Sequence, residues 1–205
     1  MWKTAIQNNK VLVNDDIVDK QLASQIDEIL YDRGISWYRL LSTIIGYKNS
    51  EEIKGTLVGW PDAIESEMFT CDLLSNELFK KHLPIMKVIK LCSKHWNIPE
   101  TNIARIKANL VYKKEGVQRN SFSTPHIDNI SPHLVLLYYA SDSDGDTIVW
   151  NKRIGQETNG MNILERISPK KGRCVLFDGS LYHSAGYPSE YDIRSTINFN
   201  LLFRF

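Results

Sequence analysis

The last segment of the chain, RSTINFNLLFRF, alternates between polar and apolar residues with a period of two. Such alternation is typical of a β-strand with one buried face and one wet face. The two faces carry Ile197, Phe199, Leu201 and Phe203 on the apolar side and Arg194, Thr196, Asn198 and Asn200 on the polar side. The apolar face is expected to pack against a hydrophobic core, so the polar face is expected to line a wet cavity. Burying an arginine there without an anion is costly, and its planar donor fork suits a carboxylate, so we expect a carboxylate ligand beside Arg194.

Two histidines and one aspartate form a second constraint. His126 and Asp128 lie two positions apart in STPHIDNISPHLVLLYY, and on an extended strand their side chains leave the same side of the backbone. His183 lies in CVLFDGSLYHSAGYP, which we interpret as a buried strand and a turn, so it must come from a different strand. Two histidines and one carboxylate can hold one face of a divalent metal and leave the other face open. This is the geometry of non-heme iron oxygenases.

Strands dominate the second half of the chain. The pattern predicts strands over residues 103–113, 134–140, 147–150, 162–167, 173–178 and 194–204. Eight short strands in two facing sheets, with helices packed outside, would form a jelly roll of the cupin kind, a double-stranded β-helix. We therefore expect a mainly β fold, in which residues 1–102 form a helical and strand region that packs on a core of residues 103–205 as one integrated domain.

The first half of the chain mixes helices and strands. Residues 10–14 are predicted as a short strand, and Asn14, Asp15 and Asp16 then open a helix that reaches Leu30 with apolar positions at helical spacing. The β-branched and aromatic run 35–47 is predicted as a strand, and residues 59–62 as a loop. Helical spacing returns over residues 75–96, where Pro84 either kinks the helix or starts a second one at Leu83.

Charge and cysteine usage suit a cytoplasmic enzyme. The 205 residues include 25 basic and 24 acidic ones, and the net charge of +1 gives no electrostatic reason to bind nucleic acid or a membrane. Cys71, Cys92 and Cys174 are odd in number and widely spaced, so we expect small buried thiols in a reducing compartment. No apolar run approaches the ~20 residues that span a bilayer, so no membrane association is expected.

The stretch from Ile103 to Phe205 resembles the Fe(II)- and 2-oxoglutarate-dependent dioxygenases, in the branch that is similar to prolyl hydroxylases. The resemblance rests on HxD, on the distal histidine and on an arginine eleven positions beyond that histidine. It implies that His126, Asp128 and His183 bind Fe(II) and that Arg194 binds the far carboxylate of 2-oxoglutarate. SPKKGRCVLFDGSLYHSAGYP also matches the family pattern of proline, glycine, apolar strand and distal histidine.

Further cosubstrate contacts are implied by the same resemblance. LVLLYYAS looks like a family strand that would place Tyr139, or alternatively Tyr138, against the far carboxylate of 2-oxoglutarate. A family contact from the strand before HxD would come from Asn109 or Tyr112, which face opposite sides of a regular strand, so only one of them fits. Thr196, on the same face as Arg194, is also expected at the cosubstrate.

The segment DGDTIVW resembles a family segment that contains two adjacent glycines. Gly145 and Thr147 match this segment, and Asp146 replaces its second glycine. The resemblance leaves the conformation of this loop open.

The implied activity is hydroxylation with O2, releasing succinate and CO2. Asp128 argues for hydroxylation because halogenating relatives carry a small residue in its place. A protein side chain such as proline, a free amino acid or a small metabolite would all fit as substrate, nucleic acid fits less well, and the oligomeric state is open. Two alternatives are a zinc-type metal hydrolase, since zinc accepts the same ligands, and a non-catalytic cupin-like binding module. The hydrolase leaves Arg194 unexplained, and the intact triad argues against the binding module.

Overall fold

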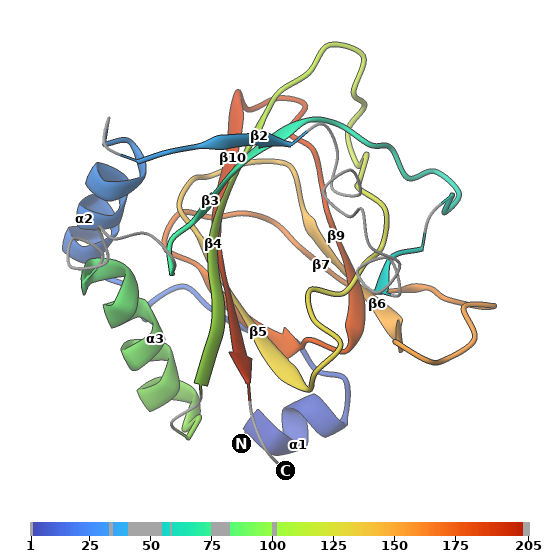
Figure 1. Cartoon of the computed structure of the whole chain (residues 1–205), viewed down its shortest axis with the longest axis horizontal. Helices are drawn as coiled ribbons and strands as arrows, with labels where there is room; N and C mark the ends of the chain where they lie inside the picture. Colours follow the sequence, from blue (N-terminus) through green and yellow to red (C-terminus); the bar gives the residue numbers. More distant parts are fainter. Residues whose placement is uncertain are drawn as a thin grey trace.

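Two β-sheets pack face to face in the computed structural model, which describes residues 2–32, 35–40, 55–57, 59–74, 83–99 and 102–202 (Figure 1). The larger sheet has seven strands in the order β1-β8-β5-β10-β4-β3-β2, and the smaller has three in the order β7-β6-β9. Helices α2 and α3 lie along the outer side of the large sheet, and the small sheet lies along its inner side (Figure 1). The predicted mainly β jelly roll with flanking helices is confirmed.

The elements have the following bounds in chain order. The helices and strands are α1 Trp2–Gln7, β1 Leu12–Asn14, α2 Lys20–Leu30, β2 Tyr38–Leu40, β3 Met68–Asp72, α3 Leu83–Trp96, β4 Asn102–Tyr112, β5 His133–Tyr139, β6 Thr147–Arg153, β7 Ile163–Ile167, β8 Cys174–Asp178, β9 Leu181–Ala185 and β10 Ile193–Leu202.

The centre of the large sheet is β10, which is hydrogen-bonded to β4 on one side and to β5 on the other. Its apolar residues Ile197, Phe199 and Leu201 are fully buried beneath the helices. Its polar residues face the small sheet. The strand therefore separates the outer core from an inner cavity, as its alternation predicts.

The outer core joins both helices to the large sheet. Ile26 and Leu30 of α2 and Val88 and Cys92 of α3 pack with the outward side chains of the central strands. A second core lies between the sheets, where Phe177 of β8 meets residues of β5, β6 and β9. Among the helices that the structure describes, none is long and apolar enough to cross a membrane.

Helix α2 begins later than predicted. Its cap is Asp19, whose Oδ1 accepts a hydrogen bond from the Leu22 amide at 2.7 Å. Asn14 instead closes a turn, because its Oδ1 accepts a hydrogen bond from the Asp16 amide at 2.8 Å. The prediction that Asn14, Asp15 and Asp16 open the helix was therefore wrong, since Asp19 is the residue that satisfies the free amides of the first turn.

The described residues form ten strands rather than the eight expected. The sequence pattern did not predict β3. One strand and a turn were expected in CVLFDGSLYHSAGYP, but this segment contains two strands, β8 and β9. Of the strand predicted over 35–47, only residues 35–40 are described, and they contribute β2. Helix α3 starts at Leu83 with Pro84 in its first turn, where proline costs no hydrogen bond, and residues 75–82 lie outside the described part.

Strands from both halves of the chain share the large sheet. β1 pairs with β8, and β3 pairs with β4. The boundary at residue 102 thus crosses one continuous sheet, and the division into an N-terminal region and a core stays a prediction. Cys71, Cys92 and Cys174 are buried free thiols, as expected.

The loop between β9 and β10 is held by Asp144. Its carboxylate accepts hydrogen bonds from the backbone amides of Ser189, Glu190 and Tyr191 and from the Ser189 hydroxyl. Burial alone would raise the pKa of Asp144, but these hydrogen bonds outweigh it and lower the pKa from 3.8 to about 2. This loop joins the strand of His183 to the strand of Arg194, so Asp144 helps to fix their separation.

Asp144→Asn is expected to destabilise the protein in a pH-dependent way. The pKa is lower in the folded state, so the carboxylate stabilises the fold above about pH 4 and loses this effect as the pH falls to about 2. At pH 7 the free energy of unfolding should fall by ~1 kcal/mol, a value reduced for solvent screening. Urea unfolding from pH 7 to pH 2 measures the difference, with the exposed Asp16→Asn as control. If the difference in free energy of unfolding between wild type and Asp144→Asn does not shrink as the pH falls, this role of Asp144 is contradicted.

Candidate metal centre and anion-binding cavity

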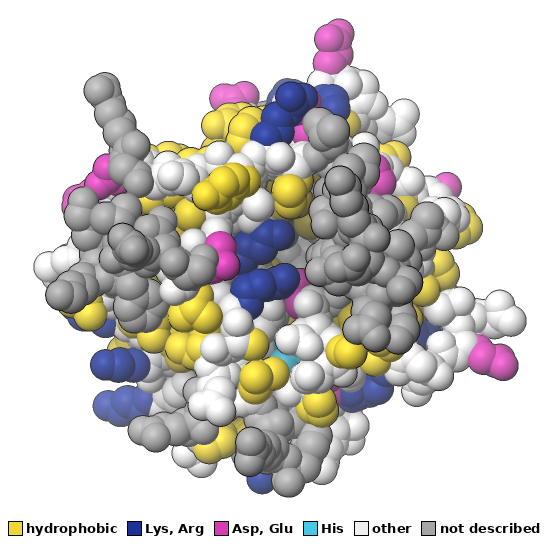
Figure 2. All heavy atoms as spheres, viewed as in Figure 1, with side chains coloured by type: hydrophobic (Ala, Val, Ile, Leu, Met, Phe, Trp, Pro, Cys, Tyr) yellow, Lys and Arg dark blue, Asp and Glu magenta, His cyan; other side chains and the backbone are white. Residues whose placement is uncertain are grey.

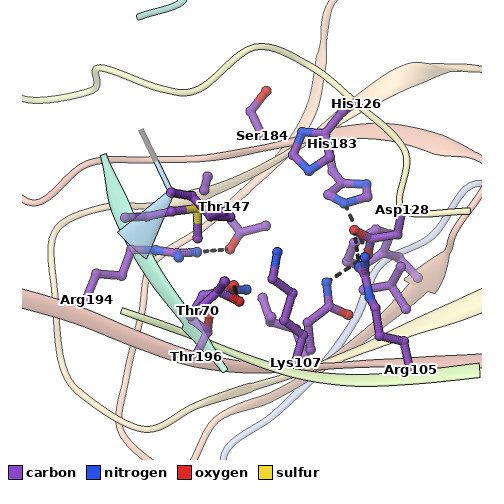
Figure 3. Close-up of a pocket in the computed structure, with 18 residues that line it drawn as sticks. Thr70, Arg105, Lys107, His126, Asp128, Thr147, His183, Ser184, Arg194 and Thr196 are labelled. Carbon is purple, nitrogen blue, oxygen red and sulfur yellow. Dashed lines mark hydrogen bonds and ion pairs between the residues drawn. The ribbon is translucent and has the colours of Figure 1, made fainter. Parts of the chain in front are cut away.

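A cavity of about 330 Å³ lies between the two sheets, which is within the usual size range of small-molecule sites. Its walls come from β2, β3, β4, β5, β6, β8, β9 and β10 and from the segment that carries His126 and Asp128. Figure 3 shows His126, His183 and Asp128 together at one end and Arg194 at the other. The sequence-predicted metal ligands and the predicted anion-binding residue therefore share one cavity.

The two histidines are held together by their own backbones. The His126 amide donates to the His183 carbonyl at 3.0 Å, and the His183 amide donates to the His126 carbonyl at 2.9 Å. The imidazole centroids are 4.8 Å apart. His126 forms isolated bridges to His183 and to Thr56 instead of belonging to a strand, so the expectation that HxD lies on a regular strand was wrong. The bridge to β9 replaces strand pairing as the means of placing His126.

Backbone carbonyls select the tautomer of both rings. His126 Nδ1 lies 3.0 Å from the Thr124 carbonyl, and His183 Nδ1 lies 3.2 Å from the Leu181 carbonyl. A carbonyl only accepts, so each Nδ1 carries a hydrogen, and in the neutral form of each ring Nε2 is the nitrogen with a free lone pair. His183 Nε2 is buried and has no hydrogen-bond partner within the described part of the chain. Burial, followed by the neighbouring His183, lowers the pKa of His126 to about 4, so this ring is neutral at physiological pH.

Asp128 is held as a carboxylate by three side chains. Arg105 Nη2 lies 2.5 Å from its Oδ1, and the amide nitrogens of Asn198 and Asn200 donate to its Oδ2 at 2.7 and 3.0 Å. Burial alone would raise the pKa of Asp128, but Arg105 and then His183 outweigh it and hold the pKa well below the usual value. The carboxylate is therefore ionised and oriented toward the histidines.

The three side chains suit a divalent metal. Their ligand atoms all lie within 4.8 Å of one another, and His183 Nε2 is 3.6 Å from Asp128 Oδ2. Two imidazole nitrogens and one carboxylate oxygen are donors that iron and zinc both accept, and three protein ligands leave further coordination positions open. The unpartnered His183 Nε2 is the observation that a metal would explain.

Arg194 is buried at the other end of the cavity. Its Nε donates to the Gly145 carbonyl at 2.7 Å and its Nη2 donates to the Thr147 hydroxyl at 2.8 Å, while the Tyr139 hydroxyl donates to the same Thr147 oxygen at 2.6 Å. Only 3% of Arg194 is exposed, and no carboxylate of the described residues forms an ion pair with it. Such a buried cation calls for an anionic ligand.

The loop at Gly145 accommodates Asp146, which stands where the family segment has its second glycine. A Cβ atom at Gly145 would lie 2.7 Å from the Gly186 carbonyl and 3.0 Å from Arg194 Cδ, so only glycine fits. Asp146 accepts a hydrogen bond from the Gly186 amide through its backbone at 2.6 Å, and its carboxylate lies 4.0 Å from Arg166. An aspartate therefore replaces the second glycine without opening the cavity.

The structure separates the alternative cosubstrate residues. Asn109 and Thr196 are opposite each other in the β4–β10 register and both line the cavity, whereas Tyr112 is 53% exposed and packs against Phe69. Tyr112 is therefore excluded from the cavity, because it lies on the opposite face of β4.

The two adjacent tyrosines of β5 also face opposite sides. Tyr139 lies beside Arg194, whose guanidinium carbon is 5.8 Å from the centre of its ring. Tyr138 faces the outer core, so the alternative placement of Tyr138 at the site is wrong.

The sequence reasoning missed two cavity cations. Arg105 and Lys107 lie on β4 on the same face as Asn109 and line the cavity with it. Their alternation with Ile106 and Ala108 is the signal that could have found them. Asn198 and Asn200 were placed on the correct face, but their bonds to Asp128 depend on contacts that are distant in the sequence.

Replacing any of the three proposed ligands is expected to abolish divalent metal binding. His126→Ala, Asp128→Ala and His183→Ala should each weaken Mn(II) or Co(II) binding by more than ~100-fold, because each removes a direct ligand. Calorimetric titration measures the affinity, and circular dichroism checks the fold. The exposed His95→Ala is the matched control. Wild-type affinity in the three variants would refute the assignment.

Asn198→Ala is expected to weaken binding of the same metal without removing one of its ligands. Losing the amide that orients Asp128 Oδ2 should reduce Mn(II) affinity by roughly 10-fold to 100-fold. Thr70→Ala is the control, because Thr70 lines the cavity but bonds to Ala108 and Asn109 rather than to Asp128. Equal affinities in wild type and Asn198→Ala would show that Asn200 and Arg105 suffice to orient the carboxylate.

Solved structures with this fold are numerous, although no protein-family model and no curated protein matches the chain in sequence. An oxidoreductase of the 2OG-Fe(II) oxygenase family from Burkholderia pseudomallei is 11% identical, with a TM-score of 0.67 over 98% of this chain and 89% of its own. The prolyl hydroxylase from Trichoplax adhaerens, solved with a hypoxia inducible factor peptide fragment, is 13% identical, with a TM-score of 0.60 over 97% of this chain and 86% of its own.

A third similar structure has a different activity. The non-heme alpha ketoglutarate dependent epimerase SnoN from nogalamycin biosynthesis is 11% identical, with a TM-score of 0.64 over 97% of this chain and 80% of its own. These similarities span nearly the whole chain. The chain therefore has the fold of the 2OG-Fe(II) oxygenase superfamily, which the resemblance of its C-terminal half predicted.

Proposed function

We propose that this chain is an Fe(II)- and 2-oxoglutarate-dependent oxygenase that hydroxylates its substrate. The observation that carries the proposal is a single cavity with three grouped metal-ligand side chains at one end and at the other a buried Arg194 that forms no ion pair with another described residue. A 2-keto acid with a second carboxylate suits both ends, because it can bind the metal and the arginine at once. The fold of SnoN, solved with Fe3+ and alpha ketoglutarate, supports this cosubstrate, with a TM-score of 0.61 at 14% identity.

The proposed roles follow from the contacts of each side chain. His126 and His183 present their Nε2 atoms to the iron, and Asp128 presents a carboxylate that Arg105, Asn198 and Asn200 keep ionised. Bound iron supplies the redox chemistry, in which O2 and 2-oxoglutarate convert a substrate C–H bond to C–OH with release of succinate and CO2. The remaining residues of the chain bind the reactants, orient them and exclude water.

The cosubstrate end is preorganised by Thr147. Its hydroxyl accepts from both Arg194 and Tyr139, so it aligns the guanidinium and the phenol toward the same region. We assign the far carboxylate of 2-oxoglutarate to Arg194 and Tyr139, with Thr196 and Asn109 lining its path to the metal. Val135, Leu137 and Phe177 form an apolar wall that keeps water from this path.

Succinate release from 2-oxoglutarate tests the proposed reaction. The protein with Fe(II), ascorbate and air should release succinate and CO2, and exclusion of O2 should stop the release. A pool of small acids, amino acids and peptides is then searched for a product that gains one oxygen atom. A product of unchanged mass would instead indicate epimerisation, as in the activity named for SnoN. Failure to bind 2-oxoglutarate in the metal-loaded protein would overturn the proposal.

Arg194→Ala separates the oxygenase from a zinc hydrolase. It should weaken 2-oxoglutarate binding to the Mn(II)-loaded protein by roughly 2–5 kcal/mol, because it breaks a buried charge pair, and leave Mn(II) affinity unchanged. Arg194→Lys should restore part of the affinity, since the charge remains while the donor fork is lost. Tyr139→Phe should cost less, roughly 0.5–1.5 kcal/mol, because the Tyr139 hydroxyl gives up its hydrogen bond to Thr147 when it donates to the carboxylate.

The binding is measured by calorimetry without O2, with the exposed Arg119→Ala as the matched control. If wild type and Arg194→Ala bind 2-oxoglutarate equally well, the arginine is structural and the hydrolase becomes the better interpretation.

A further inference from the structure

The cavity wall carries more positive charge than the proposed metal and cosubstrate require. Its described residues include three cations, Arg105, Lys107 and Arg194, but a single carboxylate, Asp128. Fe(II) and the 2-oxoglutarate dianion cancel each other. Among the described lining residues, an excess of two positive charges therefore remains once both are bound, and such an excess is unfavourable in a partly desolvated site.

Lys107 is the least compensated of these cations. It lies opposite Asn198 in the β4–β10 register, and its side chain projects into the middle of the cavity (Figure 3). Within the described part of the chain, its ammonium forms no hydrogen bond or ion pair. Burial, followed by the neighbouring Arg105, lowers its pKa to about 8, so at neutral pH it still carries its proton. Arg105, in contrast, already pairs with Asp128.

Lys107 and Arg194 point to different parts of the cavity. The Arg194 guanidinium turns toward Gly145 and Thr147 beside the small sheet, and toward Tyr139 on β5. Lys107 lies on β4, the neighbour of β3, whose Met68 forms part of the wall next to Leu40 of β2. One anionic group held at Arg194 therefore leaves Lys107 to meet another.

The charged side chains on one face of the molecule are consistent with an anionic ligand. Lys and Arg side chains gather at the centre of the face shown in Figure 2, where a histidine and smaller areas of Asp or Glu are also visible. The protein as a whole is nearly neutral, with a net charge of +1, so this concentration of cations is local. A local positive potential at a cavity attracts anions and raises their rate of entry.

We propose that Lys107, supported by Arg105, binds an anionic group of the primary substrate and so selects a small carboxylate or phosphate compound. The proposal rests on the proposed oxygenase function, because it assigns Arg194 to the cosubstrate. Met68 and Leu40 suit an apolar portion of the same substrate. A neutral prolyl side chain would leave the excess charge uncompensated, so a small organic acid or phosphorylated metabolite fits this cavity better.

The stability of the ligand-free protein gives the first test. Lys107 is half-buried next to Arg105 and forms no ion pair with the other described residues, so Lys107→Met should raise the Tm of the protein when metal, cosubstrate and substrate are absent. A lysine with a structural role would show the opposite sign. Lys87→Met, at an exposed position of α3, is the matched control. A lower Tm for Lys107→Met than for wild type would overturn the proposal.

Binding of two simple anions gives the second test. The protein, in excess over Mn(II) and saturated with 2-oxoglutarate without O2, is titrated with inorganic phosphate or with acetate at constant ionic strength. Mn(II) speeds the nuclear relaxation of nearby ligands, so relaxation of the phosphate 31P and the acetate carboxylate 13C reports binding close to the metal. Wild type should show saturable enhancement with at least one anion, and the anion that binds identifies the phosphate or carboxylate class.

The variants separate Lys107 from the cosubstrate site. Lys107→Met should weaken binding of the anion by about 10-fold or more, as expected for loss of one charge-assisted hydrogen bond. Lys107→Arg and Lys87→Met should retain binding, and 2-oxoglutarate affinity should stay within about threefold of wild type in all three variants.

Three outcomes distinguish failure of the subsite from failure of the function. Absence of 2-oxoglutarate binding to wild type would overturn the proposed function itself. Normal 2-oxoglutarate binding without saturable relaxation of either anion would overturn the subsite alone. An equal loss of 2-oxoglutarate affinity in Lys107→Met would assign the lysine to the cosubstrate and would also overturn the subsite.

Discussion

The pairing of β10 with β4 and β5 is the constraint on which the rest of the structure depends. Hydrogen bonds on both edges fix its rotation, so Ile197, Phe199 and Leu201 stay in the outer core while alternate residues face the cavity. A slip of one residue would move Arg194 into the apolar core and expose the apolar face to the cavity. Burial of one face thus sets the position of every polar group on the other.

The proposed metal ligands are held by β10 on one side and by the small sheet on the other. Asn198 and Asn200 reach from β10 to Asp128, and the bridge between His126 and His183 attaches the same segment to the small sheet. The three proposed ligands are therefore oriented by both sheets rather than by one rigid strand. Any change in the spacing of the sheets would alter the metal site and the path to Arg194 together.

Local periodicity predicted the features that depend on one strand. The two faces of β10 and the separation of Asn109 from Tyr112 follow from alternation along the chain, whereas the three proposed ligands were grouped by their residue types and by the family resemblance. The same rule could have placed Arg105 and Lys107 beside Asn109, but only the folded structure shows that Lys107 forms no ion pair with the other described residues. Partners such as Arg105 and Asp128 are joined by strand order, which periodicity does not encode.

The misplaced elements have different physical causes. β3 has only five residues, and its burial does not alternate regularly, so its sequence carries no strand signal of its own. The start of α2 was misplaced because several acidic or amide residues precede it, and each can cap a helix. Asp19 is selected by the position from which α2 can pack against α3 and the sheet, which is a tertiary requirement.

The charges of the cavity connect its stability to its proposed function. Without ligands, Asp128 offsets Arg105. Arg194 is buried and Lys107 is half-buried, and neither forms an ion pair with another described residue, which opposes folding. A divalent metal would add to this positive potential, so it would strengthen binding of the dianionic cosubstrate, and the charge left at Lys107 would then favour an anionic substrate. Each binding step in this order compensates a charge that the sheets hold in place. The folded protein thus carries an electrostatic strain that its reactants relieve, and this links the selectivity of the site to the pairing of β4 with β10.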